Sequence, residues 1–386
     1  MAGCSATTPR SPREVLLVAP SLSCGGAERV LVLLAQGLLA REHRVSAVTI
    51  FGEDHDFYRL PDRVRREALA LGGDSSNLVQ RIAGNSRRLR ALRKVIRQWR
   101  PDVIVSFLCE TNVLALLSTV GLKVPVVVTE HSDSRRRPPP GIWERLRRAS
   151  YGRAARLVSV SPGVDAYFRW LPEGRRAVIP NPLCLAELRS PVGEAPWFGW
   201  QRTALGAGRL ETEKGFDLLI RAFAGLAADF PEWGLMICGE GSQRSDLESL
   251  VTRLGLGGRV RLPGTRQHFF ATLNKADLFV LPSRHEGFGN ALVEAMGCGL
   301  PAIATDCWSE PPGIVRHGED GLLVPPDDVD TLAAAMAELM ADPEKRRRLG
   351  QRAKAAAERF DLDRVMVSWE ELLDAVISRP IGSSAR

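Results

Sequence analysis

Short apolar runs alternate with stretches of helical periodicity in the first half of the chain. The run Val15–Ala19 ends at Pro20, a glycine-bearing loop follows, and Ala27–Ala40 then repeats apolar side chains at helical spacing. Arg44–Phe51 has the composition of another strand. This order predicts the opening of a doubly wound α/β domain. Further strands are expected at Val103–Phe107, Val124–Thr129, Arg156–Val160 and Arg176–Pro180, and a basic helix over Arg81–Arg100.

The same alternation restarts after the mixed stretch Ser190–Gln201. Strands are predicted at Thr203–Gly208, Leu235–Cys238, Arg259–Leu262, Leu278–Leu281 and Ala302–Thr305. Helices are predicted over Gly215–Phe230, Ser242–Leu254, Phe269–Ala276, Asp328–Ala341 and Pro343–Arg359, and another begins with Asn290–Gly297. The two halves share an order of elements rather than a repeated sequence.

We therefore expect an α/β protein with two Rossmann-like doubly wound domains that face each other across a cleft. A length of 386 residues suits two domains. The expected limits are a disordered tail at 1–13, a first domain at 14–185, a linker at 186–200, a second domain at 201–360, a C-terminal helix at 361–378 that packs back on the first domain, and a tail at 379–386. Ligands of such sheets bind beyond the carboxyl ends of the strands, so the loops there are where chemistry is expected.

Composition and charge narrow the class of protein. The net charge of +7 and the pI near 9.3 suit an anionic partner, such as a phosphorylated ligand, an acidic membrane face or nucleic acid. The seven cysteines are dispersed without a C-x-x-C pair, which argues against zinc and fits a reducing cytosol. The first residues are polar, so no secretory signal is predicted. The sequence contains no run of about 18 apolar residues, so no membrane span is predicted.

The strongest chemical signal is the stretch from His285 to Pro301, which follows an apolar strand and opens a helix. Backbone N–H groups at a helix start suit an anion or sugar hydroxyls, and the glycines beside them allow a ligand to approach the backbone. Glu286 precedes the helix and Glu294 lies two turns into it, so the two carboxylates can reach different hydroxyl groups of one ligand. The alternative is a solvated helix start with two surface acids.

A second signal is the stretch from Gly206 to Gly215, which begins at the end of the predicted strand Thr203–Gly208. Arg209 and Lys214 place two cations there, which suits a diphosphate neutralised by side chains. A dinucleotide fingerprint is not in register, and a solvated basic loop is the remaining alternative. The turn Gly239–Ser242, with Glu240 in it and Ser242 as the expected helix cap, is also consistent with a plain structural turn.

The first half offers two weaker signals. Gly25 and Gly26 precede a helix and can contact a phosphate, or they form a tight turn for packing. His131 ends a strand, where it could hydrogen-bond a hydroxyl group or carry partial positive charge, although a lone histidine is often structural. The Asp-x-Asp triplets at Asp54–Asp56, Asp328–Asp330 and Asp361–Asp363 are interpreted as loop or helix-cap acids, so no metal site is predicted.

These motifs together resemble family 4 retaining glycosyltransferases of the GT-B fold, from about Val15 to Leu373. The resemblance rests on five motifs: Gly-Gly-Ala-Glu-Arg at 25–29, Glu-His-Ser at 130–132, Gly-Arg-Leu-x-x-x-Lys-Gly at 208–215, Gly-Glu-Gly at 239–241, and Glu-Gly-Phe-Gly at 286–289 followed by Glu294. The first half, with Ser106, Asn112 and Glu130–Ser132, is similar to bacterial transferases that extend polyprenyl-diphosphate-linked glycans, including GalNAc transferases.

The resemblance implies roles for the loop residues of the second domain, which would bind the nucleotide sugar. Arg209 and Lys214 would bind the donor diphosphate and stabilise the departing nucleotide, Glu294 would hold the ribose, and Glu286 would hold the sugar. Glu240 would join the donor site, and Phe288, Gly289 and Asn290 would offer backbone N–H groups. In the first domain, which would bind the acceptor, Gly25 and Gly26 would close over the phosphate and His131 would contact the donor sugar.

The implied activity is a hexosyltransferase that moves a sugar, a hexose or an N-acetylhexosamine, from a UDP-sugar to a glycan acceptor with retention at the anomeric carbon. The resemblance implies no cofactor, because no metal is required and the nucleotide sugar is a substrate. A polyprenyl-diphosphate-linked saccharide is the expected acceptor, in the assembly of surface polysaccharide or glycan. The alternatives are a soluble acceptor, an epimerase or phosphorylase, or a basic module for membranes or nucleic acid, for which no recognition motif occurs.

A concentration of basic residues in the first half predicts a surface for the acceptor or the membrane. Eight of them lie on the predicted basic helix, namely Arg81, Arg87, Arg88, Arg90, Arg93, Lys94, Arg97 and Arg100. Arg135–Arg137, Arg145, Arg147 and Arg148 extend the positive charge, with Trp143 and Leu146 expected to insert shallowly into a bilayer. The expected location is the cytoplasm, peripheral on the inner face of the cell membrane; a solvated arginine-rich face is the alternative.

Overall fold

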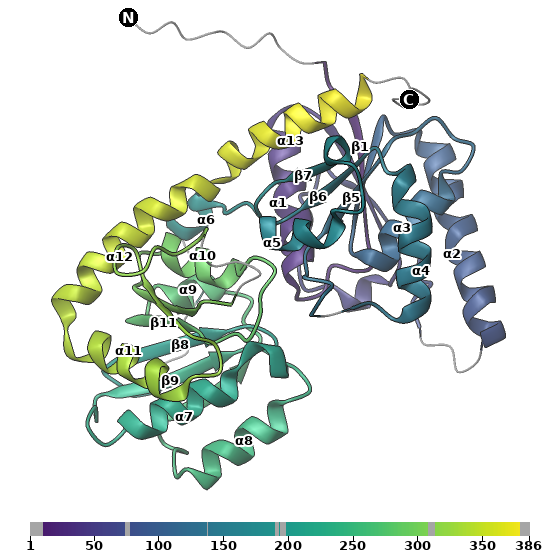
Figure 1. Cartoon of the computed structure of the whole chain (residues 1–386). Helices are drawn as coiled ribbons and strands as arrows, with labels where there is room; N and C mark the ends of the chain where they lie inside the picture. The colour runs from purple at the N-terminus through teal and green to yellow at the C-terminus, as the bar shows by residue number, and fades with distance from the viewer. Residues whose placement is uncertain are drawn as a thin grey trace, which may run out of the picture. The chain divides into compact units, whose positions relative to one another are not determined.

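The computed structural model describes residues 11–73, 78–136, 138–189, 193, 198–307 and 313–378. The chain divides into two compact units. The first comprises Met1–Thr129, Pro140–Leu157 and Trp369–Arg386, and the second comprises Glu130–Pro139 and Val158–Ser368. The predicted domain limits at residues 185 and 200 stay predictions. Figure 1 shows two parallel sheets flanked by helices, as the patterning predicts.

The first sheet has the strand order β3-β2-β1-β4-β5-β6-β7. Its strands are β1 (Glu14–Ala19), β2 (Arg44–Thr49), β3 (Arg65–Ala68), β4 (Val103–Phe107), β5 (Val126–Glu130), β6 (Arg156–Ser159) and β7 (Arg176–Val178). The central strands β1 and β4 pair in parallel, with Val15 beside Val103. They are near-continuous apolar runs because helices cover both faces of a parallel sheet.

The helices of this half include α1 (Gly26–Ala40), α2 (Leu78–Trp99), α3 (Cys109–Ser118), α4 (Gly141–Ser150), α5 (Pro162–Asp165) and α6 (Leu185–Arg189). The patterning did not predict α3, since Thr111–Leu116 are all buried and leave no polar face to give a helical period. It also did not predict β3, which begins with three consecutive charged residues and lies at one edge of the sheet.

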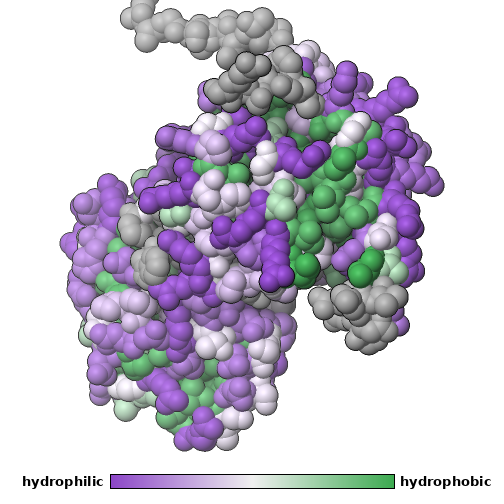
Figure 2. Space-filling model, turned by 45° about the vertical axis from the view of Figure 1, so that its right-hand side comes forward, coloured by the Kyte–Doolittle hydropathy of each residue, from purple (hydrophilic) through white to green (hydrophobic). Residues whose placement is uncertain are grey.

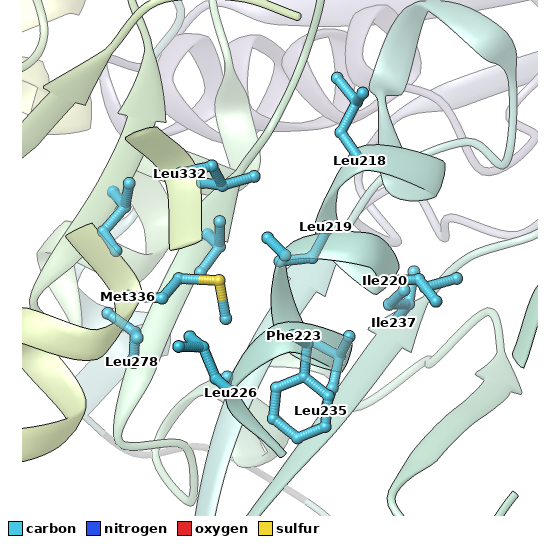
Figure 3. Close-up of a cluster of buried hydrophobic side chains, with 14 of the residues drawn as sticks. Leu218, Leu219, Ile220, Phe223, Leu226, Leu235, Ile237, Leu278, Leu332 and Met336 are labelled. Atoms are coloured by element: carbon cyan, nitrogen blue, oxygen red, sulfur yellow. The ribbon is translucent and has the colours of Figure 1, made fainter. Parts of the chain in front are cut away.

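The second sheet has the order β10-β9-β8-β11-β12-β13. Its strands are β8 (Arg202–Ala207), β9 (Trp233–Cys238), β10 (Val260–Gly264), β11 (Leu278–Leu281), β12 (Ala302–Thr305) and β13 (Leu322–Val324). Its helices include α7 (Phe216–Leu226), α8 (Arg244–Arg253), α9 (Phe269–Leu273), α10 (Asn290–Gly297), α11 (Val329–Ala341) and α12 (Pro343–Ala357), and α13 (Leu362–Ile377) follows. Figure 3 shows the core of this unit, where Leu219 and Phe223 of α7 face Met336 of α11.

The order of the second sheet reverses between β8 and β11, which are neighbours in the sheet although β9 and β10 lie between them in the chain. Leu278 lies beside Ala204 and Phe279 beside Leu205 in a parallel register. The carboxyl ends of both strands therefore meet at one edge, at the switch point where open α/β sheets bind ligands. The loop with Arg209 and Lys214 leaves β8, and the loop with Glu286 leaves β11, so this topology brings the two strongest motifs together.

One predicted helix cap is wrong. Helix α8 begins at Arg244 with Gln243 at its N-cap, two residues after the predicted start at Ser242. The Ser242 hydroxyl instead donates to the Glu211 carboxylate at 2.7 Å, and the Ser242 N–H donates to the same carboxylate at 3.1 Å. The side chain of Glu211, for which no role was predicted, therefore joins the loops after β8 and β9.

Candidate functional site

The centre of the candidate site is an ion pair between Lys214 and Glu286. The Lys214 ammonium donates to Glu286 Oε1 at 2.5 Å, and the two side chains are 17% and 8% exposed. The Ser283 hydroxyl donates to the same oxygen at 2.8 Å, and the Thr305 hydroxyl donates to the Ser283 carbonyl. The carboxylate is therefore fixed by a charge and a neutral donor before any ligand arrives.

The backbone packs closely at both glycines that flank this pair. Gly215 has φ +64°, and a Cβ there would lie 2.1 Å from the Pro282 carbonyl oxygen. A Cβ on Gly287 would lie 2.1 Å from the carbonyl oxygen of His131, which belongs to the same compact unit. These positions require glycine because any side chain would force the segments apart.

Arg209 lies on the same loop as Lys214 but is more accessible. Its guanidinium donates to Glu213 Oε1 at 3.0 Å, and its side chain is 45% exposed. An exposed ion pair of this kind contributes little to stability and is easily exchanged for another anion. The two predicted cations therefore differ: Lys214 is held inside the site, and Arg209 lies at its surface.

The start of α10 presents the predicted backbone donors. Gly289 occupies the N-cap position with φ +89° and Asn290 is the first helical residue. The Asn181 amide donates to Asn290 Oδ1 at 2.8 Å. The Phe288 side chain is buried edge-on against Phe360, with ring centroids 5.3 Å apart, so its ring serves packing and its backbone N–H is the group left for the predicted role.

Glu294 and Glu240, both predicted to bind the donor, have different surroundings. Glu294 is half-buried in the second turn of α10, on the helix that begins beside Glu286. The Glu240 carboxylate is exposed and accepts two hydrogen bonds from Arg244, at 2.7 and 2.8 Å. The structure therefore places Glu294 on the element that carries the site, and it pairs Glu240 with the first residue of α8.

His131 follows β5 and belongs to the second unit together with Lys214 and Glu286. Burial lowers the pKa of the His131 imidazole to about 4, so the ring is neutral at pH 7. Of the two roles that the sequence left open, a neutral hydrogen-bonding ring fits this environment and a cation does not. Burial also lowers the pKa of His285, although Glu213 and Glu286 oppose the shift.

Gly25 and Gly26 lie in the first unit at the start of α1. Gly25 is the N-cap in an extended conformation and Gly26 is the first helical residue, as predicted. A Cβ on Gly25 would lie 2.1 Å from a carboxylate oxygen of the buried Glu28 side chain. That atom is the far end of a flexible side chain and can move, so the packing role and the phosphate role of Gly25 both stay predictions.

The predicted basic surface divides into structural and exposed residues. Arg88 donates to the carbonyls of Leu71 and Gly73, and Arg93 donates to those of Ser118 and Val120 at 2.7 Å each, so both cations fasten loops. The exposed cations of α2 recur at intervals of three or four residues and share one helix face; they are Arg87, Arg90, Lys94 and Arg97. The side chain of Arg81 lies outside the described residues.

The prediction that Trp143 inserts into a bilayer is wrong. Trp143 is 7% exposed and Arg147 is fully buried in an ion pair with Glu144, because α4 packs against α3.

Hydrophilic and apolar residues both lie on the molecular surface shown in Figure 2. The exposed large apolar side chains of this half include Ile82 on α2 and Ile142 on α4. Among the described helices, none combines the length and apolar composition that crossing a membrane would need.

The acidic triplets serve as loop and cap residues where the structure describes them. Asp56 pairs with Arg66, and Asp328 caps α11 by accepting from the Thr331 N–H at 2.9 Å. Within the described part of the chain, no group of three or more His, Cys, Asp or Glu side chains is arranged to hold a metal ion. Metal independence stays a prediction.

Sequence reasoning missed Ser283, Arg284 and Thr305. Ser283 and Arg284 lie in the loop after β11, and Thr305 ends the neighbouring strand β12. Their position at the carboxyl edge of the sheet was a usable signal. A serine, an arginine and a threonine in that position carry no motif of their own, so only the fold shows that they contact the Glu286 and Lys214 loops.

Comparisons with known proteins identify the family and the fold of the chain. The family model for glycosyl transferases group 1 matches residues 195–356, and the model for glycosyltransferase family 4 matches residues 24–187. The structure of HepE (Alr3699) from Anabaena in complex with UDP and glucose has a TM-score of 0.76 and 22% identity, covering 94% of this chain and 100% of that chain.

Two curated relatives are similar in sequence. The Campylobacter jejuni alpha-1,4-N-acetyl-D-galactosaminyltransferase acting on GalNAc-alpha-(1->4)-GalNAc-alpha-(1->3)-diNAcBac-PP-undecaprenol is 29% identical over 94% of this chain and 99% of its own length. The Streptomyces coelicolor exopolysaccharide phosphotransferase SCO2592 is 34% identical over 75% of this chain, which spans 30% of that longer protein. With both halves matched by family models, the chain belongs to the family 4 glycosyltransferases of the GT-B fold and is a glycosyltransferase.

Proposed function

We propose that this glycosyltransferase uses a UDP-sugar, with a hexose or N-acetylhexosamine as the transferred group, and that it retains the anomeric configuration without a metal ion. The observation that carries the proposal is the buried Lys214–Glu286 pair at the switch point between β8 and β11. A cation and a carboxylate in one desolvated place match the two parts of a nucleotide sugar, which are an anionic diphosphate and a hydroxyl-rich ring.

The donor assignment is supported by charge and by a structural neighbour. The Anabaena HepE structure, which shares this fold, is a complex with UDP and glucose. In this chain Arg209 and Lys214 supply two positive charges on the loop after β8, and the N-terminus of α10 adds its dipole. Together these groups can balance a diphosphate without a divalent ion.

The chemistry follows from where charge develops. As the bond between the anomeric carbon and the diphosphate breaks, negative charge grows on the leaving oxygen, and Lys214 and Arg209 stabilise it. Glu286 and the neutral His131 orient the sugar through its hydroxyl groups. The acceptor hydroxyl attacks from the face that the diphosphate leaves, and the leaving phosphate takes its proton, which gives retention.

The proposed acceptor is a polyprenyl-diphosphate-linked saccharide, met at the cytoplasmic surface of the membrane. The Campylobacter jejuni relative acts on an undecaprenyl-diphosphate-linked glycan. The exposed cations of α2, led by Arg87, Arg90 and Lys94, would meet the anionic lipid surface or the diphosphate of such an acceptor. The exposed Ile82 on the same helix can enter the interface.

Purified protein incubated with a panel of UDP- and GDP-sugars tests the proposal. We expect one UDP-sugar to release UDP, faster with undecaprenyl-diphosphate-linked saccharide than with water, in buffer that contains excess EDTA. The coupling constant of the new anomeric proton in the product should match that of the donor. Release that EDTA abolishes and magnesium restores would contradict metal independence, and an inverted product would contradict retention. Transfer to free sugars alone would favour a soluble acceptor.

A further inference from the structure

Arg284 joins three separate segments around the candidate site. Its guanidinium makes two parallel hydrogen bonds to the Asp217 carboxylate, both 2.9 Å long, at the start of α7. It donates to the Thr212 carbonyl at 2.7 Å and to Asp327 at 2.6 Å in the loop after β13. The side chain is 22% exposed, so these bonds are partly shielded from water.

The contacts of Arg284 bracket Lys214. Arg284 binds the carbonyl of Thr212 through its side chain, and its backbone N–H donates to the Glu213 carbonyl at 2.8 Å. On the far side of Lys214, Gly215 lies against the Pro282 carbonyl. The short 3-10 turn Thr212–Lys214 is therefore fastened to the loop after β11 on both sides of the lysine.

Charge makes this fastening specific to arginine. Burial by itself would raise the pKa of Asp217, but the hydrogen bonds and the charge of Arg284, together with backbone hydrogen bonds, lower it overall. The hydrogen bond to Asp217 raises the pKa of Arg284. The planar guanidinium can serve a carboxylate with one edge and still donate to a carbonyl and a second carboxylate. A lysine ammonium is a point donor and cannot span the same three segments.

We propose that Arg284 is a positioning residue for the transfer reaction. It holds the Thr212–Lys214 turn so that the Lys214 ammonium points to Glu286 and to the place of the donor diphosphate. The inference rests on the proposed function, because it assigns Arg284 a role in donor binding through Lys214. Arg284 itself contacts no reacting atom in this role.

A double-mutant cycle on UDP affinity, measured by calorimetry, tests the inference. We expect Lys214→Ala to weaken UDP binding about tenfold, as for the loss of one charge-assisted hydrogen bond. Arg284→Ala should weaken it several-fold, whereas the double variant should bind no more than about twofold more weakly than Lys214→Ala alone, since two residues that act through one interaction are not additive. Arg284→Lys should restore less than half of the lost affinity on a logarithmic scale.

The matched control is Arg316→Ala, which removes an arginine that also pairs with an aspartate, Asp320, but on another loop of the same unit. It should leave UDP affinity unchanged. If Arg284→Ala is not folded, Asp217→Asn, which weakens the same fastening and retains the arginine, replaces it in the cycle with the same expectation.

The outcomes separate the inference from the function on which it rests. Wild-type affinity in Arg284→Ala, or effects of Arg284→Ala and Lys214→Ala that multiply in the double variant, would overturn the positioning role while UDP binding stands. No UDP binding by the wild-type protein would overturn the proposed donor and the inference together.

Discussion

The Lys214 ammonium lies 2.5 Å from Glu286 Oε1, and the same oxygen accepts the Ser283 hydroxyl. Two largely buried charges depend on each other, because either one alone would be left without compensation in a place that water reaches poorly. This relationship links the stability of the fold to the residues that we propose bind the donor.

Removing Lys214 should therefore destabilise the protein more than removing a surface lysine. We expect Lys214→Ala to lower the free energy of unfolding by about 2–4 kcal/mol, and the added change Glu286→Gln to recover part of the loss. Urea unfolding measures both. Lys345→Ala, which removes the partner of a glutamate, Glu338, that is exposed where Glu286 is buried, is the control and should cost about 0–1 kcal/mol. Equal losses for the two lysines would show that the buried pair has no special role.

Glu294 should matter for the nucleotide rather than for the fold. We expect Glu294→Ala to weaken UDP binding by about 1.5–3 kcal/mol, because the ribose hydroxyls would lose a charged acceptor. Calorimetry with UDP measures the change. Glu248→Ala, which removes a surface glutamate paired with Arg244, should leave the affinity as it is. A Glu294→Ala variant with wild-type affinity for UDP would remove this residue from the donor site.

The lowered pKa of His131 predicts a pH dependence of stability. Its folded pKa of about 4 lies below the ordinary value of 6.5, so the unfolded chain binds more protons between these values. The stabilisation is complete above pH 6.5 and is lost as the pH falls toward 4. From pH 7 to 5 the wild-type protein should lose about 2 kcal/mol more than His131→Gln. An imidazole that titrates near pH 6.5 in the NMR spectrum of the folded protein would contradict this.

The exposed cations of α2 should control binding to membranes. We expect Arg87→Glu, Arg90→Glu and Lys94→Glu together to reduce flotation with anionic liposomes at low salt, since each cation near an anionic leaflet contributes on the order of 1 kcal/mol. The matched control changes Arg347, Arg348 and Arg352, three exposed residues of α12, to glutamate. Equal recovery of both triple variants with anionic and neutral liposomes would remove the membrane claim.

Local sequence signals predicted elements better than partnerships. The start of α10 at Asn290 was predicted, and Gly289 occupies the N-cap position before it. The bond between Lys214 and Glu286 joins residues 72 positions apart, so it follows from the β8–β11 pairing and not from either motif. In the sequence, Arg88 and Arg93 cannot be told apart from the other basic residues of α2. Their hydrogen bonds to the carbonyls of neighbouring loops show that these two arginines hold the loops in place.

The pairing of Lys214 with Glu286 also means that the proposed donor site contains its own competitor. A donor diphosphate cannot gain the full attraction of the ammonium, because it must first displace a carboxylate held at a very high effective concentration. The carboxylate so released becomes available to the sugar hydroxyls at the moment the phosphate takes its place. A nucleotide without a sugar would displace Glu286 from Lys214 but would provide no sugar hydroxyl groups as new hydrogen-bond partners for the carboxylate. This difference favours binding of the complete donor over binding of the product nucleotide.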